Sequence, residues 1–584
     1  MKLKNIYTVA LASLTLAACG DMDYKEYVVN DKEFIEGNFS YVGGFMSKIY
    51  NDLDADFGNF GGAMHSSATD ESVFSTSGNA VEDFLNGAWS PANPRADIWT
   101  SAWEGITYCN EFLDNWTGLT FDELKLNDGY VKRMFQYNNY QYECRALRAY
   151  YYFTLVRQYG DIPFKEHNAT GTEETALPRT SANEIFNFIE SECDDIKDKI
   201  IVDYTDIGDM SINSPETGRI NKIAVLAIKA QAAMYHASPL FNPNNDVNLW
   251  HKACLAYKEL MEECKAEGKT LCPKYSTLWS DTYYSDADFY KENLFTRRVA
   301  ASTSFETYNL PVGYSSGKGG NCPTQDLVDA YDCTDGLPID ESPLYDPQNP
   351  YANRDSRLSM TVACNGDVWP NDIVNTSYSA LQTYIGGAHG SGSGTSYYTP
   401  TSYYLKKFVY ASCILRSGYT TAATYHPWIV YRLGGAYLNY AECLFQYFKA
   451  QGKENAADAV TDEFDVAART YASKTRVRAG LPEFPRNMTN DEFWARYKKE
   501  RQVELAFEGH RFYDVRRWKD TEEATKFLNI HAMDITLNED GSYSYAKRAI
   551  TRGDGKWQEK WNLFPISQTE ISKSGGALTQ NPGW

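Results

Sequence analysis

Apolar residues recur at three- and four-residue intervals in several long segments, which is the spacing of amphipathic helices. Residues that start and stop helices mark their ends: Ser181 begins one segment, Gly160 follows another, and Gly480 ends a third. Neighbouring segments are joined by short polar turns, which is typical of antiparallel helix pairs in tetratricopeptide-like repeats. The predicted helical segments are 131–159, 181–200, 219–241, 247–267, 428–450, 458–479 and 491–518.

The pattern changes between residues 271 and 426, where Gly, Ser, Tyr, Asn and Pro dominate. A long irregular segment inside a compact chain is usually either functional or disordered. The tyrosines and tryptophans of this segment favour ordered, functional loops. Residues 66–95 have a similar loop-like composition. We therefore expect this segment to form ordered, functional loops.

The N-terminus has the features of an export signal. Lys2 and Lys4 precede an apolar run at 6–16, too short for a bilayer crossing of about 20 residues. Leu16-Ala17-Ala18-Cys19 then resembles a bacterial lipobox. The resemblance implies that residues 1–18 are a lipoprotein signal peptide and that Cys19 carries the lipid anchor; the alternative is an ordinary signal peptide with a chance cysteine. Residues 19–33 then form the lipidated cysteine and a polar tether. Two or three acyl chains anchor a protein stably.

Charge and composition exclude some ligand classes. The chain has 56 Lys and Arg against 77 Asp and Glu, a net charge of -21 that argues against binding nucleic acid. Aromatic residues make up 15%, including 44 Tyr and 13 Trp. Many of these rings must be partly exposed, because a core cannot satisfy so many phenolic hydroxyls. An acidic, aromatic surface suits neutral ligands with weakly polar faces, such as sugars.

The cysteines and histidines give no sign of a metal centre or a cofactor. Apart from Cys19, the other eleven of the 12 cysteines are scattered without Cys-x-x-Cys spacing. This pattern favours small buried hydrophobes over a zinc ribbon or a disulfide framework. The eight histidines show no paired metal-ligand spacing on a helix. We expect no metal and no cofactor.

A family resemblance is visible near the C-terminus. The sequence from Glu500 to Trp518 closely resembles the signature of the SusD/RagB family, the outer-membrane glycan-binding lipoproteins of Bacteroidetes. Two departures are Ser567, where the family has a proline, and the helix-weakening pair Gly434-Gly435, at about 1 kcal/mol per glycine. Further matches follow in the family's order: Arg148–Phe153, Tyr159–Pro163, Pro323–Tyr331, Asn353–Arg357 and Gln580–Trp584.

The resemblance implies a mainly α-helical fold, in which tetratricopeptide-like helix pairs form a scaffold (an alpha-alpha superhelix) with long irregular ligand-binding loops. Residues 34–584 would form a single SusD-like domain, with 271–426 as a loop-rich insertion. It also implies a lipid-anchored position in the outer membrane, facing the exterior. The implied partner is a SusC-like TonB-dependent transporter, which receives oligo- or polysaccharide from the protein. Alternatives are a peptide-binding or purely structural lid, or a surface glycosidase.

Glu500, Glu504 and Glu508 recur every four residues, so on one helix face their like charges would repel. Paired carboxylates can serve as the acid and base of a glycosidase. They can also be a structural network, if nearby cations fold over them. We favour the structural interpretation, because the run lies on a helix and not at a loop rim. The cations considered are Arg501, Arg511, Arg516 and Arg517, or other cations of the chain.

The remaining candidates are loop aromatics, whose rings can pack on the C–H face of a sugar. Trp89 lies in a loop that corresponds roughly to one in which relatives carry a binding tryptophan. Trp99 and Trp103 precede a helical run and are expected in the core. We predict that at least two rings from the complete set contact glycan and that the protein has no catalysis of its own. The set is Trp89, Tyr283, Tyr284, Tyr308, Tyr314 and Trp369.

Overall fold

The computed structural model describes residues 37–95, 98–168, 176–204, 207–210, 218–313, 317–368, 380–393, 396–410, 413, 415 and 423–584. The expected signal peptide, Cys19 and the tether at 19–33 lie outside these ranges. None of the described helices combines the length and apolarity that a bilayer crossing requires. The eleven cysteines in the described ranges are buried free thiols, which confirms their predicted role as small hydrophobes.

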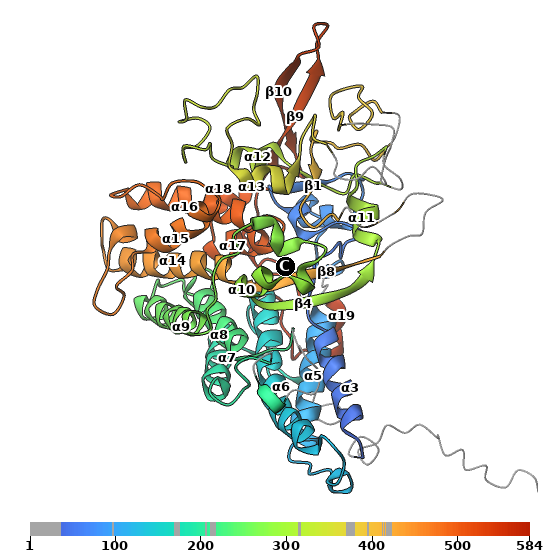
Figure 1. Ribbon diagram of the computed structural model, residues 1–584, viewed down its shortest axis with the longest axis vertical. Coiled ribbons are helices and arrows are strands. Elements are labelled where there is room, and N and C mark those ends of the chain that lie inside the picture. Colours follow the sequence, from blue (N-terminus) through green and yellow to red (C-terminus); the bar gives the residue numbers. More distant parts are fainter. Residues whose placement is uncertain are drawn as a thin grey trace, which may run out of the picture.

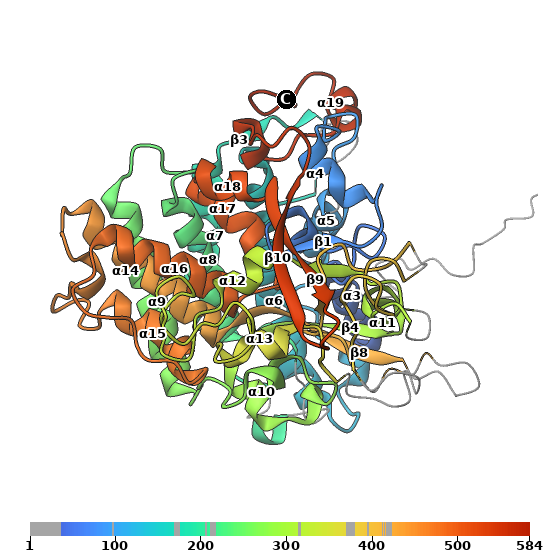
Figure 2. The same cartoon turned by 90° about the horizontal axis from the view of Figure 1, so that it is seen from above.

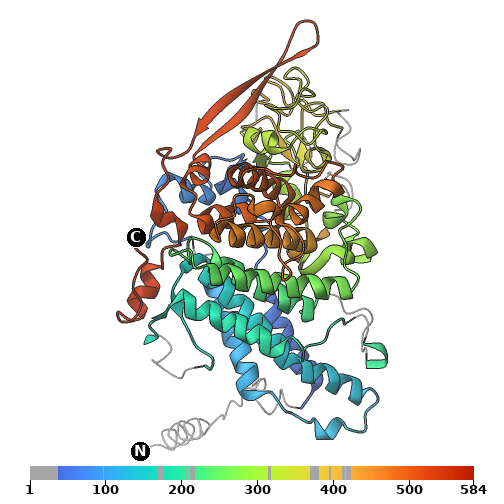
Figure 3. The same ribbon diagram turned by 90° about the vertical axis from the view of Figure 1, so that its left-hand side faces the viewer.

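The scaffold is a stack of helices in which each packs against the next along the chain. Figure 3 shows the layers: teal helices at one end, green helices in the middle and orange helices above them. The predicted tetratricopeptide-like, mainly helical fold is confirmed. The helices of the stack are α5 (Trp99–Asn115), α6 (Tyr130–Tyr159), α7 (Ala182–Ile196), α8 (Lys222–Ala237), α9 (Val247–Ala266), α14 (Leu433–Ala450), α15 (Ala468–Arg478) and α16 (Asn490–Glu504).

Three predicted segments need correction. Residues 428–432 belong to strand β8 (Thr424–Arg432), and helix α15 begins ten residues after the predicted start at 458. The predicted helix over 491–518 is two helices, α16 and α17 (His510–Trp518). The chain turns between them because Phe507 and Gly509 have φ of 63° and 78°, in the left-handed region that ends a helix. Glu508 therefore lies in a turn and not on the face shared by Glu500 and Glu504.

Short strands and helices complete the fold around the stack (Figure 1). The strands pair antiparallel as β1 (Ser72–Phe74) with β5 (Asn321–Pro323), β2 (Ile162–Pro163) with β3 (Arg179–Thr180), β4 (Asn293–Ser302) with β8, β6 (Val362–Ala363) with β7 (Tyr404–Leu405), and β9 (Asn529–Leu537) with β10 (Tyr543–Thr551). The β9–β10 hairpin projects from the top of the molecule in Figure 1. The short helices that matter below are α3 (Phe39–Asn51), α4 (Asp83–Asn86), α10 (Ala287–Glu292), α11 (Ser304–Asn309), α12 (Gln325–Ala330), α13 (Ser356–Thr361), α18 (Thr521–Lys526) and α19 (Gln568–Lys573).

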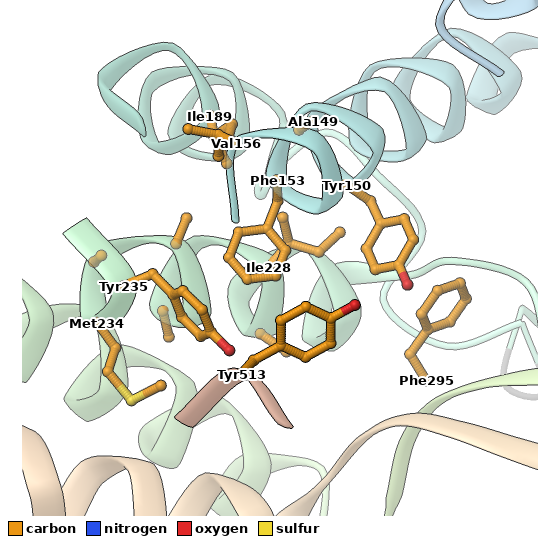
Figure 4. Packing of buried hydrophobic residues seen from close by; sticks show 14 of the residues in the cluster. Ala149, Tyr150, Phe153, Val156, Ile189, Ile228, Met234, Tyr235, Phe295 and Tyr513 are labelled. Carbon is orange, nitrogen blue, oxygen red and sulfur yellow. The ribbon is translucent and has the colours of Figure 1, made fainter. Parts of the chain in front are cut away.

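The hydrophobic core runs between the stacked helices. Figure 4 shows Phe153 of α6 over α8, where its ring centroid lies 5.1 Å from that of Tyr235. Helices α5 and α6 approach closely because Gly105 has no side chain. A Cβ on Gly105 would lie 2.4 Å from the Tyr151 ring. Small and large residues thus interdigitate, as dense protein interiors require.

A buried set of charges, here called the Arg432 cluster, joins the helix stack to the 271–426 insertion. Arg432, at the end of β8, forms ion pairs with three glutamates. The nitrogen-to-oxygen distances are 2.6 Å to Glu504, 2.8 Å to Glu508 and 2.9 Å to Glu292. Arg357 of α13 holds Glu500 at 2.7 Å and Glu504 at 2.8 Å. No side chain in the cluster is more than 4% exposed. Its members are Glu292, Asp355, Arg357, Lys407, Arg432, Arg478, Glu500, Glu504 and Glu508.

The cluster confirms the predicted charge network but corrects its partners. Arg501 pairs with Asp514, Arg517 with Glu442 and Asp514, and Arg511 with Asp70 and Glu523. Arg516 donates to backbone carbonyls instead. The three glutamates take their cations from segments distant in sequence, a juxtaposition that no local spacing shows.

The charged state of the cluster follows from its geometry. Burial by itself raises the pKa of Glu508, but Arg432 and Lys407 outweigh it and hold that pKa at about 2. Burial likewise raises the pKa of Glu504, and three guanidinium groups together hold it well below its usual range. Both carboxylates are ionised at neutral pH. The Glu508 contribution to stability is therefore complete above its ordinary pKa of 4.5 and is lost as the pH falls toward 2.

The glycine pair in α14 fits against the Arg432 cluster. Helix α14 begins at Leu433, so both glycines lie in its first turn. A Cβ on Gly434 would lie 2.4 Å from Arg432 Nη1 and 2.8 Å from Glu292 Oε1. Those atoms cannot retreat without breaking ion pairs. A Cβ on Gly435 would meet only Leu505 Cδ2, at 3.7 Å.

We predict that Gly434→Ala lowers the free energy of unfolding by about 1–3 kcal/mol, although alanine is the better helix former. The matched control Gly435→Ala should be neutral or stabilising by up to about 1 kcal/mol. Urea denaturation of both variants measures the difference. Equal stability of the two variants would contradict the steric role of the cluster.

Candidate functional site

Two exposed tyrosines, Tyr284 and Tyr425, are both close enough to the buried Tyr283 to act on it electrostatically. Tyr284 precedes α10 and β4, and Tyr425 lies near the start of β8; their side chains are 55% and 57% exposed. Tyr290 and Arg298 flank them, with Tyr290 partly exposed and Arg298 exposed. We call these four residues the Tyr284 patch. They bring together segments more than a hundred residues apart in the sequence.

Hydrogen bonds fix the geometry of the Tyr284 patch. Arg298 Nη2 donates to Tyr290 Oη at 3.1 Å, and Tyr290 Oη donates to the Tyr284 carbonyl at 3.2 Å. Tyr283 lies beneath, with its ring centroid 5.9 Å from that of Tyr284. Burial, opposed in part by the Arg298 guanidinium, raises the pKa of Tyr283 to about 12. The patch is therefore a supported aromatic surface with one cation at its side.

A second group, the Tyr308 patch, comprises Ser75, Tyr308, Lys318 and Tyr397. One face of the Tyr308 ring packs on the backbone of Gly62, where a Cβ would come within 2.3 Å of the ring. The Lys318 ammonium lies 4.9 Å from the ring centroid. Ser75 Oγ donates to the Lys318 carbonyl at 2.6 Å, which joins the 66–95 loop to the insertion. Tyr397 is 38% exposed.

Asn321 holds these two loop regions together. Its Oδ1 accepts hydrogen bonds from Met64 N and Ser67 Oγ, both at 2.9 Å. Its Nδ2 donates to the Gly62 carbonyl at 3.2 Å and to Asn309 Oδ1 at 2.9 Å. Asn321 is fully buried, so these bonds are not exchanged with water. The ordered loops predicted from composition are thus held by a shared polar centre.

The structure corrects two candidate residues. Trp89 is 2% exposed; its ring centroid lies 4.8 Å from those of Phe84 and Phe564 and 4.9 Å from that of Trp584. Its Nε1 donates to the Pro94 carbonyl at 2.8 Å, so no face and no polar atom is left for a ligand. Tyr283 is also 2% exposed and supports Tyr284 instead of offering a ring. Both are packing residues in this structure.

The other candidates fall into three groups. Tyr284 and Tyr308 keep accessible surface and belong to the two patches. Tyr314 and Trp369 lie outside the described residues. Trp99 and Trp103, expected in the core before a helix, lie inside α5 and are only partly buried.

Sequence reasoning missed Tyr425, Arg298, Lys318 and Tyr397. Tyr425 lies at the end of the predicted loop segment, directly before the buried His426 of β8. The β8 residues do not alternate between exposed and buried, so strand periodicity gave no signal for it. Arg298 and Lys318 carried no comparable signal, because single cations in a loop-rich segment usually only face solvent.

The carboxylates considered for catalysis are not accessible. Glu500, Glu504 and Glu508 all lie in the Arg432 cluster, with side chains at most 3% exposed. Held by guanidinium groups below the surface, they cannot reach a glycosidic bond. Among the described residues, no group of three or more His, Cys, Asp or Glu side chains is placed to hold a metal ion.

Comparison with known families agrees with the resemblance at the C-terminus. The model described as "SusD family" matches residues 278–584, more than half of the chain. The chain belongs to the SusD/RagB family. A second model, described as "Starch-binding associating with outer membrane", matches residues 55–234. SusD-like protein P38 of Formosa agariphila is 31% identical over 97 residues, a match that spans 16% of each chain.

Solved structures of SusD-like proteins share the fold. A SusD-like protein of Bacteroides fragilis is 21% identical, with a TM-score of 0.72 over 97% of this chain and all of the other. A SusD-like carbohydrate-binding protein of the same species is 20% identical, with a TM-score of 0.69 over 93% and 99% of the two chains. Surface glycan-binding protein A of Bacteroides fluxus is 19% identical, with a TM-score of 0.59 over 94% and 100%.

We predict that Trp89→Ala destabilises the protein by about 3–5 kcal/mol, because it leaves a cavity among buried rings. Tyr284→Ala, which removes an exposed ring, should leave the melting temperature unchanged. Thermal unfolding followed by circular dichroism compares the two variants. A Trp89→Ala variant as stable as the parent would contradict the packing role assigned to this side chain.

Proposed function

We propose that this protein is a surface-exposed, lipid-anchored, non-catalytic glycan-binding protein. It captures oligo- or polysaccharide and passes it to a SusC-like TonB-dependent transporter in the outer membrane. The observation that carries the proposal is the Tyr284 patch: two exposed tyrosine rings, one of them backed by Tyr283, on a chain of the SusD/RagB family. Two proteins of similar solved structure are named as a carbohydrate-binding protein and a surface glycan-binding protein, which supports glycan as the ligand class.

The chemistry of the Tyr284 patch suits capture without cleavage. Rigid phenol rings pack on the C–H faces of sugars at low entropic cost, while Arg298 and the phenol hydroxyls can hydrogen-bond sugar hydroxyls. The Tyr308 patch adds two more accessible tyrosines, Tyr308 and Tyr397, and Lys318. Neither patch contains a carboxylate that could act as a glycosidase acid or base. We therefore assign ligand binding to these loops and no turnover.

We predict that Tyr284→Ala and Tyr425→Ala each weaken binding of the best polysaccharide ligand about tenfold, or about 1.4 kcal/mol. The loss follows from removing ring surface that is exposed in the free protein. Tyr308→Ala tests the second patch in the same way. Isothermal calorimetry gives the affinities, and melting curves confirm that each variant is folded.

Exposed Tyr41 of α3, which is 42% exposed, provides a matched control. Tyr41→Ala removes the same ring from a helix away from both patches and should bind like the parent. If Tyr284→Ala, Tyr425→Ala and Tyr308→Ala also bind like the parent, the assignment of the binding surface is wrong.

The lipid anchor gives a separate prediction. Cys19→Ala removes the only acylation site that the lipobox offers, so the protein should leave the membrane fraction. Cell fractionation with fatty-acid labelling measures this. Retained labelling and unchanged fractionation in the variant would contradict the lipobox assignment.

The transporter gives the last prediction of this section. A lid over a barrel must be held by protein contacts, because an anchor alone leaves it free to diffuse in the membrane. Mild-detergent purification of the tagged protein from its native host should therefore recover a TonB-dependent barrel. Failure to recover such a protein, even after crosslinking, would favour a free-standing receptor.

A further inference from the structure

A cavity of about 260 Å³ lies at the end of the molecule where the C-terminal segment meets α5. Figure 2 shows this end, with α19 and the C-terminus close to α4. Three separate segments line the cavity: α5, the chain on either side of the β2–β3 connection, and α19 with the residues after it. None of the accessible loop tyrosines described above lines it. It is many times larger than the about 30 Å³ that a water molecule takes in the liquid.

The walls of the cavity are fixed by hydrogen bonds between distant segments. Arg179 of β3 donates to the Tyr159 carbonyl at 3.2 Å and to the Thr579 carbonyl at 3.1 Å. Asn581 Nδ2 donates to the Tyr159 carbonyl at 2.9 Å and to the Phe564 carbonyl at 2.8 Å. The C-terminal segment is thereby tied to the end of α6. A preformed cavity of this kind is typical of small-molecule sites.

Two tryptophans form one wall of the cavity. Trp99 and Trp103 are four residues apart on α5, and their ring centroids lie 5.9 Å apart at an interplanar angle of 66°. Trp99 is supported edge to face by Tyr159, at 4.8 Å, and Trp103 by Tyr152, at 6.1 Å. Both indoles remain partly exposed. They make a rigid apolar corner of the kind on which a sugar ring can pack.

The polar groups of the cavity offer both donors and acceptors. Lys165, only 8% exposed, donates from Nζ to Thr107 Oγ1 at 3.2 Å. Glu570 and Lys573 of α19 form an ion pair at 2.9 Å on the opposite wall. Hydroxyl groups can bond to either a donor or an acceptor. A charged ligand, whether a carboxylate or an ammonium, would be attracted by one member of the Glu570–Lys573 pair and repelled by the other.

We propose that this cavity is a second carbohydrate site, which takes one neutral sugar ring from the end or a branch of a glycan. The inference rests on the proposed glycan-binding function and adds a site that is separate from the Tyr284 patch. The ring would pack in the corner of Trp99 and Trp103, with hydroxyls toward Thr107 and Lys165. A glycan long enough to engage both sites would bind more tightly than either site alone allows.

The test uses the purified full-length chain, the polysaccharide that it binds best, and trisaccharides released from that polysaccharide by digestion. Leu177→Trp fills the cavity from a partly exposed position on its lining. Trp103→Phe keeps an aromatic ring but removes the indole N–H. Lys573→Ala, at an exposed position, serves as the variant least able to disturb folding.

Calorimetry should give two trisaccharide sites per chain in the parent and one in Leu177→Trp. Trp103→Phe should weaken the cavity site about tenfold, and Lys573→Ala should weaken it by a smaller factor. Polysaccharide binding through the Tyr284 patch should survive in all three variants. Tyr284→Ala should show the converse pattern, with the cavity site retained.

The outcomes separate the two proposals. The cavity proposal is overturned if the parent binds one trisaccharide per chain and all three cavity variants bind like the parent. The loop assignment alone is overturned if Leu177→Trp abolishes polysaccharide binding while Tyr284→Ala and Tyr425→Ala leave it unchanged. A parent protein that binds no polysaccharide from a broad panel overturns both.

Discussion

Charge neutralisation below the surface is the constraint on which this structure depends. In the Arg432 cluster, the ends of α10, α15 and α16 meet β8 and α13 around carboxylates that no solvent reaches. Glu292 and Glu504 each end a helix, where the helix dipole disfavours a negative charge, so they require the arginines. Removing one partner from a buried ion pair costs about 3–5 kcal/mol, because the remaining charge is left uncompensated. The loop insertion and the helix stack are therefore stable only together.

This coupling explains how long loops can present a defined surface. Arg357 and Lys407 come from the insertion, while Arg478 and Glu504 come from the helix stack. Asn321 then ties the 66–95 loop to the same insertion. The Tyr284 and Tyr308 patches are thus rings on fixed supports rather than on mobile tips. Rings held in place lose little entropy on binding, which suits recognition of repeated sugar units.

Periodicity along the chain was enough to find most of the helix stack. The segment 247–267 presents one apolar face to its neighbours, and the spacing of its apolar residues shows that face directly. The segment 131–159 was also found, although its second half is buried on nearly all sides. Periodicity failed at 428–432, where a mostly buried run forms a strand. It also failed at 505–509, where Phe507 adopts the left-handed region and interrupts a helical spacing of apolar residues that continues across the turn. The β9–β10 hairpin was not anticipated either.

The candidate site was less predictable, because exposure depends on distant segments. Trp89 looked like a loop ring, yet the C-terminal Trp584 and Phe564 cover it. Trp99 and Trp103 looked like core, yet they line an open cavity. Of the four candidate rings that the structure describes, Tyr284 and Tyr308 keep accessible surface, and Tyr425, which was not among the candidates, lies near the Tyr283 side chain. Tertiary structure, not residue type, decides which ring a ligand can reach.

The central claim is capture of glycan without cleavage. Its most direct test is electrophoresis of the purified protein through gels that each contain one polysaccharide, with an assay of reducing ends on the same mixtures after prolonged incubation. The account predicts that at least one polysaccharide retards the protein and that no reducing ends are released above the level of the polysaccharide alone. Release of reducing ends by the parent protein, or migration unchanged by every polysaccharide, would contradict it.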